Sequence, residues 1–453
     1  MSQQTNNIVL TVAGSDSGGG AGIQADLKTF SAFGLFGKTI ITSVTSQNSF
    51  GVQSSYDLPV SVIEDQFQAI IQDKKCKAIK IGMLGNEKTV LMVTRMIKKS
   101  RLKKIVIDPV VISSSGKRLL TKNGIDALKE NLLPLAALVT PNIKEAELLS
   151  GIKIKNPSDR KKAAKAILKT GARAVLITGG HLKGDPEDLY LDGKNMHVFS
   201  SKRLTKIDIH GTGCVFSAAI TAGLAKGISL LAAIQNAKKY IGEIILAAFT
   251  PGNGLPCVDP TTVIYKEREK LQGICELNNA LEIFKKERIG NLIPEVQTNI
   301  GLGLSNATKH EDVLAIPGRI IKNGEDIFTG AQPQFGGSRH VANIVLTVMQ
   351  YDHEKRAVMN IKYTDTLLKI CKKLKFKISS FDRAKEPKYI RALEGSSLEW
   401  GTEKAIIRYG SVPDIIYDLG GIRKEEMIRV IAKDIGSLVK KILAIHRSYK
   451  RYL

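Results

Sequence analysis

Runs of apolar and β-branched residues alternate with amphipathic stretches up to about residue 250. Most of these runs are continuous, which is typical of strands buried on both faces of a parallel sheet. The stretches between them, for example 21–33 and 161–170, have helical spacing, and longer helices are expected after Gly213 and over 230–249. This alternation predicts an α/β fold, a mostly parallel sheet with helices on both faces. The predicted strands are 8–14, 39–47, 78–82, 104–111, 136–142 and 174–180.

The pattern changes after about residue 262. A loop rich in glycine and proline (251–262) is followed by a charged stretch (265–286) that predicts a helix. We therefore divide the chain into a first domain, 1–264, and a second, smaller α/β domain, 265–453. In the second domain we expect strands within 313–320, 356–363, 375–382 and 415–421, and helices over 341–350 and 427–445.

The composition is that of an ordinary folded protein. The 453 residues are 43% hydrophobic and 24% charged, which excludes a disordered chain. Five scattered cysteines without a C-x-x-C pair argue against a disulfide framework or a zinc site and fit a reducing cytoplasm. The apolar runs are shorter than the roughly 18–20 residues of a membrane span, and we see no secretory signal.

The charge of the chain favours anionic ligands. The formal net charge is +24, from 67 Lys and Arg against 43 Asp and Glu. Such a field attracts nucleic acids and phosphorylated small molecules alike, and general lysine enrichment would also produce it. Because the charge is spread along the chain rather than gathered in one arm, we do not expect a nucleic-acid partner.

Two glycine-rich loops stand out in the first domain. The first, A-G-S-D-S-G-G-G-A-G (13–22), lies between a predicted strand and a predicted helix. It has neither the G-x-G-x-x-G spacing of a dinucleotide fingerprint nor a P-loop pattern. Glycine lets the backbone approach a ligand closely, but a flexible turn is an equal reading of this loop alone.

The second loop, 210–214 (H-G-T-G-C), opens a strongly apolar helix. Backbone N–H groups at such a helix start, together with the helix dipole, form an anion hole suited to a transferring phosphoryl group. Cys214 is expected in the first turn, where a thiol pKa is lowered, so that it could deprotonate an attacking hydroxyl. The alternative is a small buried cysteine that only packs.

Together the two loops resemble the ribokinase-like superfamily, and within it the hydroxymethylpyrimidine/phosphomethylpyrimidine kinases. The resemblance covers residues 8 to about 262. It implies a ribokinase-like fold and two successive phosphorylations, by ATP, of 4-amino-5-hydroxymethyl-2-methylpyrimidine to its monophosphate and diphosphate. The matching segments are 13–30, 42–52, 80–85, 106–111, 140–149, 178–181 and 210–214.

The resemblance assigns roles to individual residues. Gln47 would hydrogen-bond the aminopyrimidine, for which an amide offers both a donor and an acceptor. Gly14 and Asp26 would lie near the pyrimidine and its hydroxymethyl group, although Asp26 could equally cap or salt-bridge its own helix. The implied phosphate-binding residues and base are Gly211, Thr212, Gly213 and Cys214.

The resemblance also implies a magnesium site. Asp108 and Glu145 would organise Mg²⁺ and phosphate oxygens through water. Asn142 and Glu145 equally fit a helix-capping pattern, so both readings stay open. One departure is Thr178, at a position where many relatives are expected to carry a lysine that would neutralise phosphate charge.

Four segments of the second domain resemble the ThiN-like thiamine-phosphate synthase domain, over about 275–450. The resemblance assigns Arg319 and His340 to catalysis and phosphate binding; by themselves they read as a surface salt bridge and an exposed or capping imidazole. The expected G-K-E-P pattern is altered, with Arg423 before Lys424 and Glu426 in place of proline. The four segments are 316–321, 330–340, 381–387 and 413–425.

The implied second reaction joins the pyrimidine diphosphate to a thiazole phosphate and releases pyrophosphate. We expect small-molecule substrates, no nucleic acid, no membrane, and a cytoplasmic homo-oligomer. In one alternative the second domain is a ligand sensor, although no DNA-reading helix-turn-helix is found. In another the kinase acts on pyridoxal. A nucleic-acid-binding protein would leave both glycine-rich loops unexplained.

Overall fold

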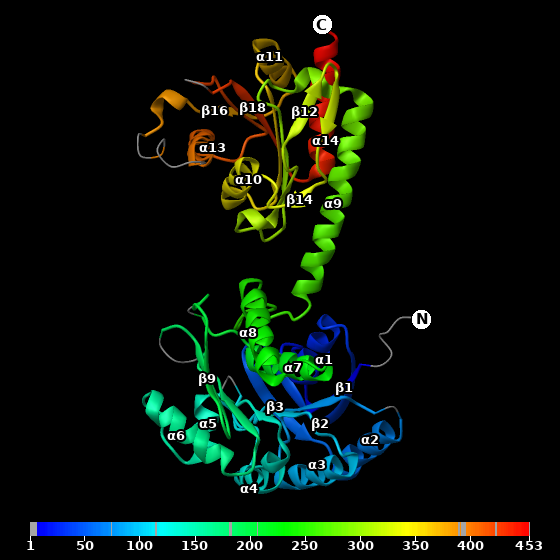
Figure 1. Ribbon diagram of the computed structural model, residues 1–453, viewed down its shortest axis with the longest axis vertical. Helices are drawn as coiled ribbons and strands as arrows, with labels where there is room; N and C mark the ends of the chain where they lie inside the picture. The colour runs from blue at the N-terminus through cyan, green and yellow to red at the C-terminus, as the bar shows by residue number, and fades with distance from the viewer. Residues whose placement is uncertain are drawn as a thin grey trace. The chain divides into compact units, whose positions relative to one another are not determined.

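The computed structural model describes residues 7–452 except 74, 114–115, 181–183, 206, 388–389, 391–395 and 422–423. The chain divides into two compact units, Met1–Ile264 (unit 1) and Tyr265–Leu453 (unit 2), which Figure 1 colours from blue to red along the sequence. Each unit is built around its own sheet.

The described residues of unit 1 form a nine-stranded sheet in the order β3-β2-β1-β4-β5-β6-β7-β8-β9. The middle strands, from β2 to β7, are parallel, as the continuous apolar runs predict, and antiparallel strands lie at both edges. The edge strands, which the sequence pattern did not predict, are β3 (Gly51–Asp57), β8 (Glu187–Asp192) and β9 (Met196–Ser200). The parallel strands are β1 (Ile8–Asp16), β2 (Phe36–Asn48), β4 (Ala78–Ile81), β5 (Ile105–Ile107), β6 (Leu138–Val139) and β7 (Ala174–Ile177).

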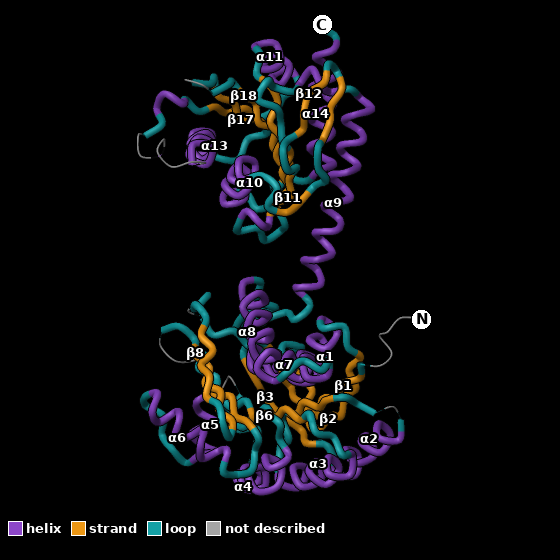
Figure 2. The backbone as a smooth tube through the Cα atoms, in the orientation of Figure 1, coloured by secondary structure: helices purple, strands orange, loops and turns teal. Residues whose placement is uncertain are grey.

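Helices cover both faces of this sheet, as expected (Figures 1 and 2). On one face, α1 (Gly22–Ala32), α7 (Thr212–Ala225) and α8 (Leu230–Leu246) pack on residues such as Val9 and Val106. The opposite face packs through alternate residues of the same strands, such as Leu10 and Ile107. Its helices are α2 (Val60–Gln72), α3 (Glu87–Ser100), α4 (Lys122–Ala127), α5 (Ile143–Ser150) and α6 (Pro157–Leu168).

The part of unit 2 that the structure describes contains a seven-stranded sheet in the order β14-β11-β10-β15-β18-β17-β16. Its strands pair antiparallel except for β16 and β17, which are parallel. The strands are β10 (Ile300–Gly303), β11 (Val313–Ala315), β14 (Gln334–Phe335), β15 (Ala357–Lys362), β16 (Ile378–Ser380), β17 (Ile415–Asp418) and β18 (Met427–Ala432). A separate hairpin joins β12 (Ile320–Asn323) to β13 (Asp326–Thr329).

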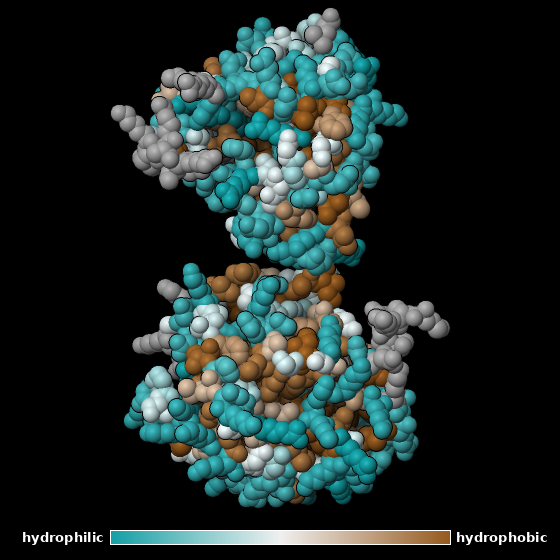
Figure 3. Space-filling view, in the orientation of Figure 1, coloured by the Kyte–Doolittle hydropathy of each residue, from teal (hydrophilic) through white to brown (hydrophobic). Residues whose placement is uncertain are grey.

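Two groups of helices sandwich this second sheet. On one face lie α9 (Thr262–Glu287), α11 (Asp365–Lys373) and α14 (Ile435–Lys450). The opposite face is covered by α10 (Arg339–Tyr351) and α13 (Ser396–Tyr409), which pack on Val358 and Ile431. Hydrophilic side chains cover most of the surface of each unit that Figure 3 shows. No helix among the described residues is long and apolar enough to cross a membrane.

One sequence prediction for unit 2 is wrong. The segment 427–445, predicted as a single helix, is strand β18 followed by helix α14. All six residues of β18 are buried between two other strands, and a short continuous apolar run does not distinguish a buried strand from a buried helix. The helix begins only after Asp434, whose side chain accepts a hydrogen bond from the N–H of Ser437.

Candidate active sites

In unit 1 the two glycine-rich loops are in direct contact. Gly211 has φ +86°, and a Cβ there would lie 1.9 Å from the carbonyl oxygen of Gly20. Gly22 has φ +57°, and its Cβ would lie 2.3 Å from the carbonyl oxygen of Gly14. At these positions a side chain is excluded both by the backbone conformation and by space. The second loop is thereby held against the first.

Asp16 organises the first loop. Its carboxylate accepts hydrogen bonds from the N–H groups of Gly18, Gly20 and Ala21 at 2.8, 3.0 and 2.7 Å. Burial alone would raise the pKa of Asp16, but hydrogen bonds from His210 and from backbone N–H groups lower it overall. Asp16 is not among the site residues predicted from the sequence. The signal was available, because an aspartate before serine and glycine commonly caps its own turn.

Helix α7 begins directly after Gly211 and is buried from Val215 to Ala225. Its first turn, Thr212 to Cys214, carries N–H groups that a helix leaves without an intrahelical partner. Gly213 is exposed at this turn. The structure thus brings Gly211, Thr212 and Gly213 together at a helix start, a geometry that suits a phosphate group.

The prediction of a lowered thiol pKa at Cys214 is wrong. Burial raises the pKa of Cys214 to about 12, and the carboxyl groups of Asp108 and Asp26 add to this effect. The ammonium of Lys80 and a hydrogen bond from the N–H of Gly22 act in the opposite direction without overcoming burial. Position in the first turn of a helix therefore does not decide the charge of this thiol, because desolvation is the larger effect.

A buried ion pair lies next to Cys214. The ammonium of Lys80, on β4, is 2.9 and 3.0 Å from the two carboxylate oxygens of Asp26, on α1, and both side chains are 0% exposed. The hydroxyl of Thr11 donates to the same carboxylate at 2.6 Å. Asp26 therefore bonds to two strands rather than capping its own helix, and its predicted contact with the pyrimidine stays a prediction. Lys80 is not among the residues predicted from the sequence, although a lysine inside the apolar run 78–82 is a visible signal.

Asp108 and Glu145 are both buried near the start of α7. Asp108 accepts a hydrogen bond from the hydroxyl of Ser217, on α7, at 2.9 Å. Glu145 forms the capping box of α5 with Asn142 and also accepts from the N–H of Val111 at 3.3 Å. Burial and the neighbouring Asp108 carboxyl raise the pKa of Glu145 to about 8. The capping reading of Glu145 is therefore correct, and its closeness to Asp108 leaves the metal-binding reading in place.

Two carboxyl groups fit a hard cation that is held partly through water and phosphate oxygens. Among the described residues there is no group of three or more His, Cys, Asp or Glu side chains able to hold a metal alone. A Mg²⁺ ion at this position would accordingly need ligands from the nucleotide and from water.

Gln47 and Gly14 both lie beside the first loop, where Gln47 exchanges hydrogen bonds with Ser17. The side-chain amide nitrogen of Gln47, at the end of β2, is 2.9 Å from Nε2 of His210. Gly14 is buried, and a Cβ there would lie 3.0 Å from Sδ of Met83. A hollow of about 410 Å³ lies beyond Gln47, over the β2–β3 turn and Lys117. The amide is therefore anchored to the second loop through His210.

Arg319 and His340 are both exposed in unit 2. Arg319 has φ +79°, and its guanidinium donates to the carbonyl of Val296. His340 is the second residue of α10, and the next residue, Val341, packs on Gly301 at the start of β10. β11 ends beside Gly301, near the start of β10. Arg319 and His340 therefore lie on the same side of the sheet, at the ends of these strands. No surface salt bridge is formed by Arg319 with a described residue.

Two residues from the family patterns, His181 and Arg423, lie outside the described residues. Lys424 is described; its ammonium lies 3.7 Å from a carboxylate oxygen of Glu386 and 3.1 Å from the hydroxyl of Ser397. In unit 1, Thr178 follows β7 and donates its N–H to the carbonyl of Pro141.

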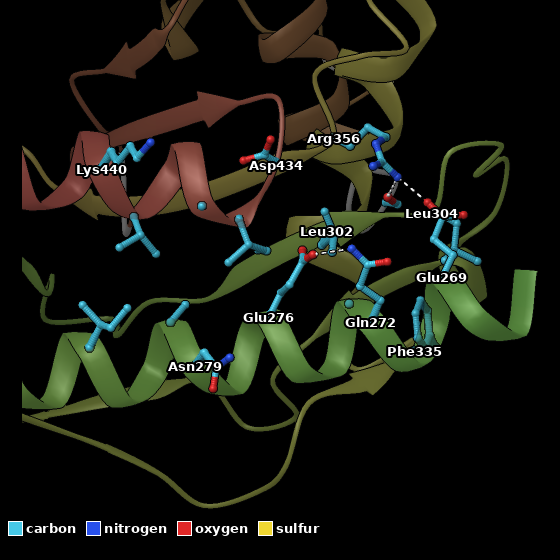
Figure 4. Close-up of a pocket in the computed structure, with 17 residues that line it drawn as sticks. Glu269, Gln272, Glu276, Asn279, Leu302, Leu304, Phe335, Arg356, Asp434 and Lys440 are labelled. Carbon is cyan, nitrogen blue, oxygen red and sulfur yellow. Dashed lines mark hydrogen bonds and ion pairs between the residues drawn. The ribbon is translucent and has the colours of Figure 1, made fainter.

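Unit 2 also contains a cavity of about 750 Å³ that the sequence did not predict. Figure 4 shows it between α9, the start of α14 and the end of β10. Arg356 bridges its wall through an ion pair with Glu269 at 2.5 Å, and the other polar residues labelled there include Glu276, Asp434 and Lys440. Since β10 ends at Gly303 here, the cavity lies at the sheet edge opposite Arg319.

The fold of unit 1, with a phosphate-compatible helix start beside two buried carboxyl groups, defines a small-molecule kinase of the ribokinase-like class. Residues 16–259 match the family described as phosphomethylpyrimidine kinase, and residues 276–444 match the one described as thiamine-phosphate synthase ThiN. The chain belongs to the phosphomethylpyrimidine kinase family and carries a ThiN domain behind its kinase domain.

Known proteins resemble the whole chain as well as its first half. The bifunctional thiamine biosynthesis protein ThiDN of Methanocaldococcus jannaschii is 36% identical over 443 residues, which are 98% of this chain and 99% of that protein. A hydroxymethylpyrimidine/phosphomethylpyrimidine kinase of Streptomyces coelicolor is 43% identical over 255 residues, 56% of this chain and 94% of that protein. The crystal structure of an ADP complex of Bacillus subtilis pyridoxal kinase matches with a TM-score of 0.54 and 37% identity, covering 57% of this chain and 99% of that one.

Proposed function

We propose that this chain is a bifunctional enzyme of thiamine biosynthesis. Unit 1 phosphorylates 4-amino-5-hydroxymethyl-2-methylpyrimidine with ATP, first to the monophosphate and then to the diphosphate. Unit 2 joins the diphosphate to 4-methyl-5-(2-phosphooxyethyl)thiazole, which yields thiamine phosphate and pyrophosphate. The similarity to a bifunctional relative over 98% of the chain supports both halves of this proposal.

The observation that carries the kinase assignment is the contact of Gly211 with Gly20. It holds the first turn of α7 beside the loop 13–22, where an acceptor hydroxyl could approach. In the first reaction the hydroxymethyl oxygen attacks the γ-phosphorus of ATP, and ADP leaves. In the second, an oxygen of the monophosphate attacks in the same way. Positioned N–H groups stabilise the charge on the transferring group, so no covalent intermediate is needed.

We assign Cys214 as the base that accepts the hydroxyl proton. Because burial raises the pKa of its thiol to about 12, this role requires the thiol to lose its proton to solvent before the sulfur accepts the hydroxyl proton. Asp108 and Glu145 would hold Mg²⁺, which supplies neutralisation of phosphate charge when bound. Gln47 would hydrogen-bond the aminopyrimidine, and Gly14 and Asp26 would lie near the pyrimidine and its hydroxymethyl group.

In unit 2, Arg319 and His340 would bind the diphosphate. The bond between the pyrimidine methylene carbon and the diphosphate oxygen breaks, and pyrophosphate leaves with the electron pair. The thiazole nitrogen then donates its lone pair to the resulting cation. Cationic donors stabilise the departing anion. The product of unit 1 is the substrate of unit 2, so tethering raises its local concentration.

We further propose that the enzyme works in the cytoplasm as a homo-oligomer on small molecules alone. All five cysteines are free thiols, in keeping with a reducing compartment. The excess of basic residues then serves anionic substrates rather than nucleic acid or a membrane surface.

The test is a coupled assay of the full-length protein with ATP, Mg²⁺, the pyrimidine alcohol and the thiazole phosphate. We expect ADP, the pyrimidine diphosphate and thiamine phosphate to appear in that order. Accumulation of the diphosphate without thiamine phosphate would favour the sensor role for unit 2. Absence of pyrimidine phosphorylation would contradict the kinase assignment.

Pyridoxal phosphorylation is the second candidate activity of unit 1. The similarity at 37% identity to the Bacillus subtilis pyridoxal kinase favours it. Comparing kcat/KM for pyridoxal and the pyrimidine alcohol in one preparation decides between them, and we expect the pyrimidine to be preferred.

A further inference from the structure

Two arginines share one buried aspartate at an edge of the unit 2 sheet. The guanidinium of Arg383 donates from Nε to Oδ1 of Asp418 at 2.5 Å and from a terminal nitrogen to Oδ2 at 3.3 Å. Arg429, on β18, contacts the same Oδ2 at 2.8 Å. The side chains of Asp418 and Arg429 are 0% and 2% exposed, and that of Arg383 is 10% exposed.

The charges of this cluster do not balance. Two guanidinium groups carry two positive charges against the single negative charge of Asp418. The buried carboxylate of Glu386 lies 3.7 Å from the ammonium of Lys424 and makes no printed bond to either guanidinium. Burying an uncompensated charge is costly, so an excess cation calls for a second anion. Burial already lowers the pKa of Arg429 despite the adjacent Asp418.

A second observation also calls for an anion. One terminal nitrogen of Arg429 is buried and has no hydrogen-bond partner among the described residues. Buried guanidinium nitrogens are normally satisfied, and leaving one unpaired costs free energy. Asp418 engages Nε and one terminal nitrogen of Arg383 and the other terminal nitrogen of Arg429, so an unmet donor remains beside a site of excess positive charge.

The surroundings hold both guanidinium groups in place. Each lies over the ring of Phe381 in a cation–π contact, with Arg383 at 5.4 Å and Arg429 at 5.1 Å from its centroid. The ring meets Trp400 edge-on at 6.2 Å. The aliphatic part of Arg383 lies against Gly421, where a Cβ would approach it to 3.7 Å. A planar guanidinium that is already ordered loses little entropy when it binds an oxyanion.

The cluster lies at the edge of the sheet where ligands are commonly bound. The neighbouring strands β16 and β17 are parallel, and their carboxyl ends lead directly to Phe381 and Asp418. Such ends are the usual ligand sites of parallel strands.

Contacts between neighbouring strands connect the cluster to the segment that carries Arg319, the other predicted site of unit 2. Arg429 pairs with Asn360, and the side chain of Asn360 accepts the N–H of Asn299. Asn299 in turn donates to the carbonyl of Ile316, three residues before Arg319. These contacts therefore link Arg429, across the neighbouring strands, to the segment that carries Arg319.

We propose that Arg383, with Arg429 as a positioning residue behind it, forms a second anion subsite of unit 2 that binds a phosphate monoester. This inference rests on the proposed synthase function, in which two different anionic groups must be held at once. Arg319 and His340 are assigned to the diphosphate, so the monoester is the phosphate of the thiazole substrate. The excess positive charge attracts a monoester, and a guanidinium offers paired donors to its oxygens.

Binding by the full-length protein, measured by titration calorimetry without turnover, tests this inference. The ligands are the thiazole phosphate, the unphosphorylated thiazole alcohol and pyrophosphate. The variants are Arg383→Gln, which removes the charge, and Arg383→Lys, which keeps the charge but loses the fork. Arg447→Gln is the matched control, because Arg447 is an exposed arginine of unit 2 paired with Glu287 on α9.

We expect wild-type protein to prefer the thiazole phosphate over the alcohol by at least about tenfold. Arg383→Gln should weaken thiazole phosphate binding by about tenfold or more, as loss of a charge-assisted hydrogen bond does, and leave alcohol and pyrophosphate affinities within about twofold. Arg383→Lys should fold like wild type and lose about threefold or more. Arg447→Gln should not change any of the three.

Three results would overturn the subsite: equal affinity of wild type for the thiazole phosphate and the alcohol, unchanged binding by both Arg383 variants, or a loss confined to pyrophosphate. The last would place the leaving group there instead. The readout separates this inference from the proposed function. Protein that binds the thiazole phosphate through Arg383 but forms no thiamine phosphate would disprove the synthase activity and leave the subsite standing.

Discussion

The buried pair of Lys80 and Asp26 makes a sharp prediction about the stability of unit 1. In Lys80→Met the carboxylate of Asp26 keeps one hydrogen bond, from Thr11, but loses the cation 2.9 Å away in a site with no solvent exposure. Removing one partner of a buried ion pair destabilises proteins by about 3–5 kcal/mol. Because the burial is complete here, we expect a loss within that range.

The isosteric variant Asp26→Asn, combined with Lys80→Met, tests whether the unpaired charge of Asp26 causes this loss of stability. It removes the unpaired carboxylate and keeps an acceptor for Thr11. We expect the double variant to be more stable than Lys80→Met by roughly 2 kcal/mol, since the residual cost is that of a buried amide rather than a buried charge.

Urea unfolding measures both effects, because urea does not screen charge. Far-UV circular dichroism follows the whole chain, while fluorescence of the single tryptophan, Trp400, reports on unit 2. We expect the Lys80→Met transition seen by circular dichroism to move by about 1–2 M. The fluorescence transition should stay within error of wild type. A loss below about 1 kcal/mol, or a double variant no more stable than the single one, would refute the reasoning.

Three further predictions concern the chemistry of unit 1. Cys214→Ala should abolish most kinase turnover and leave pyrimidine binding nearly intact. Because the thiol pKa is raised to about 12, the kcat of the wild-type enzyme should rise with pH from 7 to 9. Cys214→Asp should remove this rise. A flat wild-type profile, or near-normal turnover of the alanine variant, would exclude the base role. Gly211→Ala should cost at least about tenfold in kinase turnover, with synthase turnover as the internal control, because its Cβ would lie 1.9 Å from a carbonyl oxygen. Unchanged kinase turnover would show that the loop contact is dispensable. Glu145→Gln should raise the Mg²⁺ concentration for half-maximal activity by about tenfold, whereas Asn142→Ala should cost only about 1 kcal/mol of stability through loss of the cap. Equal Mg²⁺ requirements would leave Glu145 with the capping role alone.

Most of the architecture was readable from the sequence. Continuous β-branched runs identify the buried parallel strands of unit 1, since side chains on both faces of such strands must be apolar. The antiparallel edge strands β3, β8 and β9 were missed because they are short or half-exposed and carry no clear period. In unit 2, six buried residues of β18 resembled a helix because their apolar run is too short to show a period.

The candidate sites, like the fold, could be predicted from the sequence only where the pattern is local. Glycine-rich loops and a cysteine at a helix start are local patterns, so the sequence identified 13–22 and 210–214 directly. The partners of charged residues are not local: Lys80 meets Asp26 across 54 residues, and Asp418 meets Arg383 across 35. No spacing rule connects such positions before the chain has folded.

By itself the sequence determined which segments are strands and helices in the first half and where glycine opens the backbone, because these follow from the chemistry of neighbouring residues. Only the tertiary structure decided the charge states and the pairing of buried groups. The pKa of the Cys214 thiol is raised to about 12 because desolvation in the folded chain outweighs the effect of the helix start. Electrostatic energies depend on distance and burial, which are properties of the folded chain.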